Sequence, residues 1–166
     1  MTVSRVCGVA AAALILAGTP VTTIAGPNDA TVPVQVALKV GEQPYRFGGE
    51  AICQHAPQAS IYDAPAALWS FRHVEPARSL NLAFWRVQAQ GDMITLGLTL
   101  SGADHRVSTV KIGQKGDVHG SGRATFTASG AGGTFSLDLV ARDGTPIKGT
   151  ISCGRFTPIV EEGGGD

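Results

Sequence analysis

The sequence predicts an all-β fold, a single antiparallel β-sandwich with an immunoglobulin-like look and about eight or nine strands. Three observations lead to this prediction. Runs of β-branched and aromatic residues recur roughly every ten residues. Clusters of Gly, Pro, Asp and Asn separate these runs, and helical periodicity is nearly absent after residue 25. Short, evenly spaced strands with frequent turn residues are typical of sandwiches and barrels.

Residues 1–25 are expected to be a secretory signal peptide. Arg5 precedes the apolar run Val9–Leu16, and the small residue Ala25 precedes the expected cleavage point. This order matches the charged, apolar and cleavage regions of an export signal. The mature protein is therefore expected to be periplasmic or extracellular.

The remaining chain is expected to form one domain over residues 26–160, followed by a disordered tail over residues 161–166. Its length suits one continuous core. The chain is 43% hydrophobic and 16% charged, unlike a disordered protein. The formal net charge is +0, which argues against nucleic acid or anionic lipid as the main partner. No mature apolar run approaches the ~20 residues of a membrane span, so no transmembrane segment is expected.

The first strands are predicted from alternating patterns. Thr31–Val40 places Val32, Val34, Val36 and Leu38 on one face. Pro33 favours an edge position because proline lacks an amide donor. Tyr45–His55 follows, with Gly48-Gly49 as an expected bulge or bend. Leu68–Val74 and Ser79–Gln88 come next and form a plausible hairpin.

The aromatic residues of this hairpin bear on function. Trp69 and Phe71 share a face, whereas the consecutive residues Phe84 and Trp85 must point to opposite faces. Either one large aromatic side chain lies off the core, or its strand is buried on both sides. Core packing and a surface patch are both open at this point.

The second half of the chain continues the pattern. Ile94–Leu100 has the cleanest alternation and is expected to be a central strand. Val107–Ile112, Gly122–Ala128 and Phe135–Ala141 follow after glycine-containing turns. The last strand, Ile147–Phe156, comes after the strong turn signal at residues 143–144.

The cysteines predict one disulfide. Cys7 would leave with the signal peptide, so the mature chain keeps Cys53 and Cys153 in a compartment where thiols oxidise. Cys153 shares a face with Ile147 and Ile151, which predicts a buried bridge. Such a bridge would clasp an early strand to the last one.

Five residues are candidates for binding: Tyr62, Trp69, Trp85, His105 and His119. The aromatic side chains could form a platform for a sugar or a patch for a partner. The two histidines follow aspartates in expected turns, where solvated side chains are the simplest interpretation. No metal-ligand spacing, nucleophile motif or cofactor motif occurs, so no catalytic residue, metal or cofactor is expected.

The segments Val107–Gly113, Gly120–Phe126 and Gly149–Cys153 resemble the small mycobacterial surface lipoprotein antigens. Those proteins also pair an early cysteine with one on the final strand. The resemblance implies an exported β-rich domain at the cell envelope, and no catalytic residues carry over. This chain lacks their lipidated cysteine.

The leading hypothesis is a non-catalytic exported protein of the bacterial cell envelope that binds an envelope protein or glycan. One alternative is a small envelope hydrolase that uses the scattered histidines and carboxylates. Another is a carrier of a small apolar ligand, which would need a hollow barrel.

Overall fold

The computed structural model describes residues 30–159, and within that range the protein consists of strands and turns with no helix. The all-β prediction is confirmed. The expected signal peptide and the expected tail lie outside the described residues. The strands are β1 (Thr31–Val40), β2 (Gln43–Ile61), β3 (Ala64–Glu75), β4 (Arg78–Val87), β5 (Gly91–Leu100), β6 (Ala103–Ser108), β7 (Ser121–Ser129), β8 (Gly132–Val140), β9 (Pro146–Cys153) and β10 (Thr157–Pro158).

These strands form one continuous sheet in the order β6-β5-β4-β3-β2-β1-β9-β8-β7, and β10 pairs with β2 in parallel. The other pairs are antiparallel. Because β5 approaches β7, the sheet is nearly closed into a barrel. The two separate sheets expected of a sandwich are not confirmed.

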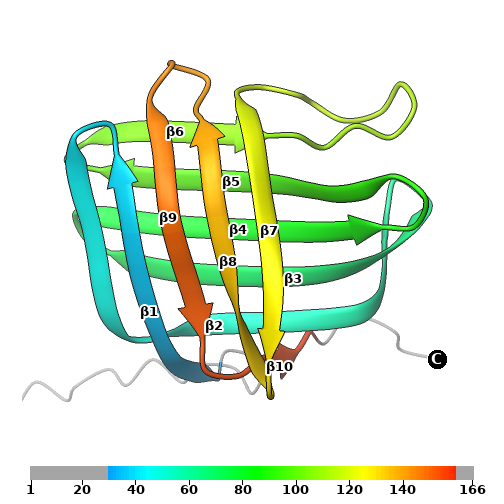
Figure 1. Cartoon of the computed structure of the whole chain (residues 1–166), viewed down its shortest axis with the longest axis horizontal. Coiled ribbons are helices and arrows are strands. Elements are labelled where there is room, and N and C mark those ends of the chain that lie inside the picture. The colour runs from blue at the N-terminus through cyan, green and yellow to red at the C-terminus, as the bar shows by residue number, and fades with distance from the viewer. Residues whose placement is uncertain (1–29, 160–166) are drawn as a thin grey trace, which may run out of the picture.

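The long strand β2 explains why one sheet makes two layers. Its first half pairs with β1 as far as Ile52, and its second half pairs with β3 from Ile52 onward. The Gly48-Gly49 pair lies just before Ile52, where β2 changes its pairing partner from β1 to β3. In Figure 1 the front layer of β1, β9, β8 and β7 runs across the rear layer of β3, β4, β5 and β6. Crossed layers joined at a corner are a known arrangement for such sheets.

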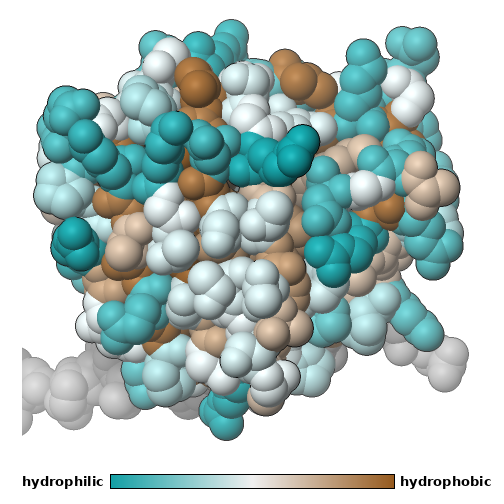
Figure 2. All heavy atoms as spheres, in the orientation of Figure 1, coloured by the Kyte–Doolittle hydropathy of each residue, from teal (hydrophilic) through white to brown (hydrophobic). Residues whose placement is uncertain are grey.

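The core fills the space between the layers. Side chains from both layers are buried in one cluster, and the largest are Tyr45, Phe71, Phe84 and Phe135. The predicted inward face of β1 is confirmed, since its valines and Leu38 are almost fully buried. Figure 2 shows that the outer face of the front layer is mostly hydrophilic or neutral, with hydrophobic residues visible in the gaps.

Three sequence predictions about strands are wrong. β1 is not an edge strand, because it pairs with both β2 and β9. Pro33 is tolerated because the β9 ladder begins at Val34, and the Pro33 carbonyl accepts a hydrogen bond from Gly154 N–H at 2.8 Å. β5 is second from the end of the sheet rather than central, and the strand predicted at Val107–Ile112 instead ends at Ser108.

The predicted disulfide joins Cys53 on β2 to Cys153 on β9. The two Cα atoms are 6.3 Å apart, and both residues are buried. Ile147 and Ile151 of β9 are also fully buried, as their shared face predicts. The bridge therefore ties two parts of the sheet on either side of β1.

A polar network closes one end of the core. Tyr45 Oη lies 2.9 Å from His73 Nδ1, and His73 Nε2 lies 3.2 Å from Glu75 Oε1. Arg78 forms a two-pronged ion pair with Glu75 and lies over the Tyr45 ring. Burial raises the pKa of Tyr45, so its hydroxyl stays protonated and serves as a hydrogen-bond partner. This network gives the buried polar atoms of Tyr45 and His73 their partners.

No helix within residues 30–159 is long and apolar enough to cross a membrane.

Candidate functional site

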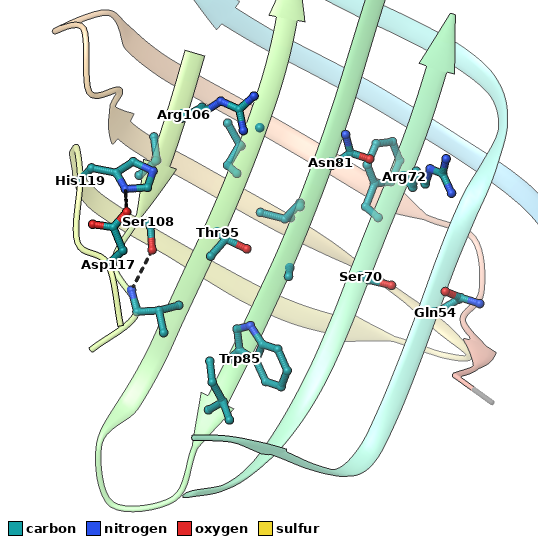
Figure 3. Close-up of a pocket in the computed structure, with 18 of the residues that line it drawn as sticks. Gln54, Ser70, Arg72, Asn81, Trp85, Thr95, Arg106, Ser108, Asp117 and His119 are labelled. Carbon is teal, nitrogen blue, oxygen red and sulfur yellow. Dashed lines mark hydrogen bonds and ion pairs between the residues drawn. The ribbon is translucent and has the colours of Figure 1, made fainter. Parts of the chain in front are cut away.

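The outward face of the rear layer carries a groove with a volume of about 770 Å³, called the outer groove below. Its floor follows from strand geometry, because successive residues point to opposite faces of a sheet. Phe71 and Leu82 face the core, while their neighbours Arg72 and Asn81 face outward. Figure 3 shows the labelled side chains gathered on one side of the sheet.

One end of the outer groove is apolar. Trp85 of β4 forms its floor and is only partly buried. It packs against a small second cluster in which Val87, Met93 and Val110 are buried and Ile61 is partly buried. The indole therefore has a fixed position while part of its surface stays open to the groove.

Two connecting segments border this apolar end. The β2–β3 turn consists of Tyr62 and Asp63, whose φ angles of 50° and 69° suit a tight two-residue hairpin. Residues 109–120 connect β6 to β7 and supply Val110 to the groove wall. Lys115 Nζ lies 2.9 Å from Asp63 Oδ2 and joins the two segments. Tyr62 remains 47% exposed beside them.

The other end of the outer groove is polar and rich in hydrogen-bond donors. Gln54, Ser70, Arg72, Asn81 and Arg106 line it. The Arg72 guanidinium makes no hydrogen bond or ion pair with any described residue. Arg106 lies 4.0 Å from an oxygen of Asp104, which is at the limit of an ion pair. Both guanidinium groups are therefore available to a ligand.

Ser108, Asp117 and His119 meet at the loop side of the groove. Ser108 and His119 are joined through their backbones, at 2.8 and 3.0 Å. His119 Nδ1 lies 3.3 Å from Asp117 Oδ2, outside hydrogen-bond geometry. The Ser108 hydroxyl accepts a hydrogen bond from Val110 N–H at 3.4 Å, as Figure 3 shows. These three residue types can serve nucleophilic catalysis, but the Ser108 hydroxyl makes no hydrogen bond to His119 in this arrangement.

The structure separates the five sequence-predicted binding residues. Tyr62, Trp85 and His119 line the outer groove, whereas Trp69 and His105 do not. Trp69 points to the core side, where it stacks on His55 with ring centroids 4.4 Å apart.

The expectation that His105 is a solvated turn residue is wrong. It lies on β6 with its side chain buried, because it faces inward like its neighbour Val107 two residues later. Its Nδ1 lies 2.8 Å from Asp143 Oδ2, across the space between β6 and the β8–β9 turn. The partner of His105 is thus Asp143 rather than the adjacent Asp104.

The Asp143 contacts predict acid sensitivity. The Thr145 N–H, followed by His105, holds the pKa of the Asp143 carboxyl below its usual value. A lowered folded-state pKa stabilises the fold above the unfolded pKa of about 3.9 and loses that contribution as pH falls through the folded value. Below about pH 4, the denaturant concentration at the midpoint of unfolding should therefore fall less steeply in Asp143→Asn than in the unmodified protein. Denaturant titrations at several pH values would measure it, and an unchanged acid limb would contradict the assignment.

Sequence reasoning missed the polar half of the outer groove. Gln54, Arg72, Asn81 and Ser108 were not candidates, although they alternate with apolar residues along their strands. That alternation shows that they face outward. It does not show that four different strands present them to one hollow.

Within the described residues, no group of three or more His, Cys, Asp or Glu side chains is placed to hold a metal ion. No protein-family model matches the sequence, and comparisons with curated proteins and with solved structures give no match.

Proposed function

We propose that this protein is an exported, non-catalytic binding protein of the cell envelope that holds an acidic oligosaccharide in the outer groove. The main support for this proposal is that one groove contains a half-buried Trp85 and two available guanidinium groups, those of Arg72 and Arg106. Each part of that combination fits one feature of an acidic sugar.

The indole of Trp85 fits the apolar face of a sugar ring. A pyranose presents C–H groups on one face and hydroxyl groups at its edge. An anchored aromatic ring can stack on that face at little entropic cost, because its position is already held by packing. Ser70 and Asn81 then stand where a hydroxyl and an amide group can bond the ring hydroxyls.

The two arginines favour a carboxylate-bearing sugar over a neutral one. A guanidinium presents parallel N–H donors that match the two oxygens of a carboxylate. The whole chain has a formal net charge of +0, so these cations are a local feature of the groove. A surrounding excess of positive charge does not account for them.

Two observations support export. The sequence has the order of regions expected of a signal peptide, and Cys53 is bridged to Cys153. Disulfides persist mainly in oxidising compartments such as the periplasm and the extracellular space. The resemblance to envelope antigens agrees with such a location.

Gly97 provides a test that leaves the fold intact. It lies on the groove floor, an added Cβ there would meet nothing within 4 Å, and its φ is not in the left-handed region. Gly97→Leu should therefore fold normally and place an apolar side chain in the middle of the groove floor. We expect it to abolish binding of an oligomer of galacturonic acid, measured by calorimetry, while Arg72→Gln weakens it about tenfold.

The two tryptophans allow a matched control. In Trp69→Phe the only tryptophan is Trp85, and its fluorescence should change on titration with the oligouronate. In Trp85→Phe the remaining Trp69 should not respond. Equal affinity for a neutral oligosaccharide would contradict the charge argument, and binding of a fatty acid in place of sugar would favour the apolar carrier.

A hydrolase is the second candidate, because Ser108, Asp117 and His119 meet at the groove wall. It requires the Ser108 hydroxyl to donate a hydrogen bond to a ring nitrogen of His119, which it can do while it still accepts one from Val110 N–H. Hydrolysis of p-nitrophenyl acetate that Ser108→Ala abolishes would favour this function over binding alone.

A further inference from the structure

The free edge of β7 is the second surface that the fold leaves ready for a ligand. β7 is the last strand of the sheet and, among the described strands, pairs only with β8. Its other edge makes no backbone hydrogen bond to the described part of the chain. In Figure 1 the rear strands β3, β4 and β5 continue beyond β7, so the front layer ends before the rear layer does.

Two hollows flank this edge along most of its length. One, of about 730 Å³, lies between the start of β5 and residues 122–125 of β7. The other, of about 510 Å³, lies beside Phe126 and Ala128 and is also lined by Trp69 and His55. The Nε2 atom of His55 is buried without a hydrogen-bond partner among the described residues. The edge therefore combines unpaired peptide groups with neighbouring space and aromatic surface.

The backbone features that commonly protect an edge against strand pairing are absent from β7. Exposed edges are commonly blocked by proline, a bulge or very short length. β7 spans nine residues, contains no proline and pairs with β8 without a register shift. Thr125, Phe126 and Thr127 favour an extended conformation.

The charges beside the edge indicate which strand would fit. Lys111 and Arg123 line the first hollow, are exposed, and have no ion-pair partner in the described chain. Asp138, which lies opposite Arg123 on β8, is bound to Lys148 at 2.9 Å. The nearby Arg86 and Asp92 neutralise each other at 2.8 Å. The two available charges are thus both positive.

We propose that the β7 edge binds an extended, acidic polypeptide segment as an added antiparallel or parallel strand. Backbone hydrogen bonds from β7 would hold the segment, and its alternate side chains would face the Trp69 and Phe126 rings. Lys111 and Arg123 would select acidic residues near the start of β7. Pairing with a second copy of this chain is disfavoured, because it would bring two more cations to the same edge.

Amide hydrogen exchange provides the test. The probe is a nine-residue peptide of alternating valine and glutamate, compared with the same peptide carrying lysine for glutamate. In an edge strand, only every second residue directs its N–H outward. We expect the acidic peptide to slow exchange at alternate amides of residues 122–128 about tenfold or more, while amides of β4 are unaffected.

Charge reversal provides the matched control. Lys111→Glu combined with Arg123→Glu should lose the acidic peptide and gain the lysine peptide. Arg46 is an exposed arginine of β2 that forms no ion pair within residues 30–159, and Arg46→Glu should behave as the unmodified protein. Absence of saturable binding, equal binding of both peptides, or protection of the same amides by protein concentration alone would overturn the proposal.

Discussion

Replacing Cys53 and Cys153 together with alanine should lower the free energy of unfolding by about 2–5 kcal/mol and leave the fold unchanged. The bridge joins residues separated by 100 positions, so it removes a long loop from the conformations open to the unfolded chain. The strands on both sides of it remain paired through β1 without it. The native contacts should therefore persist at a lower melting temperature.

Thermal unfolding of the double variant, followed by circular dichroism, would measure this loss. Oxidised and reduced forms of the unmodified protein give the matched comparison. Two free thiols at these positions after alkylation under denaturing, non-reducing conditions would refute the bridge. An unchanged melting temperature would refute its stabilising role.

Phe84→Ala should destabilise the protein by about 3–5 kcal/mol. Phe84 is fully buried and joins the two layers, with its ring centroid 5.8 Å from that of Phe135 and 6.1 Å from that of Phe126. Removing it leaves a cavity between β4 and the β7–β8 pair that rigid strands cannot fill. Guanidinium titration would measure the change.

Val74→Ala is the control for this substitution, since Val74 lies on the adjacent strand β3 and is 60% exposed. It should change the free energy of unfolding by no more than about 0.5 kcal/mol. A comparable cost for both variants would show that the rear layer does not pack on the front layer through Phe84.

The strands were predictable because apolar and polar residues alternate along them, and this alternation indicates which side chains are buried. β1 was predicted with its observed bounds, and the inward faces of β5 and β9 followed from Ile94 and Ile151 in the same way. The disulfide was predictable because two cysteines remain after the expected signal peptide, and its burial was predictable because Cys153 shares a strand face with Ile147 and Ile151. Local sequence carries this information, since each side chain has to face either the core or solvent.

The arrangement of the strands was less predictable, because it depends on contacts far apart in the chain. Pro33 suggested an edge, yet its strand lies within the sheet because the β9 ladder stops one residue short of it. The closure of one sheet into two layers depends on the length of β2, which extends to Ile61 rather than His55. The pattern of Tyr45–His55 alone gives no sign of that extension.

The candidate site was half predictable for the same reason. The opposite orientation of Phe84 and Trp85 could be predicted because they are consecutive in a strand, but the residue that faces outward could not, and the structure shows that it is Trp85. His105 could not be paired with Asp143, since 38 residues separate them. Arg72 became a candidate binding residue only in the structure, where the sheet pairs it with Asn81 of the next strand.

Chemical-shift mapping with an oligomer of galacturonic acid tests the binding account most directly. The isotope-labelled protein reports every described backbone amide and both indole N–H groups at once. Binding in the outer groove predicts the largest saturable shifts at Ser70, Asn81, Thr95 and the Trp85 indole, with none in Gly97→Leu. Shifts centred on the front layer or on the β7 edge, or no saturable shifts at all, would contradict it.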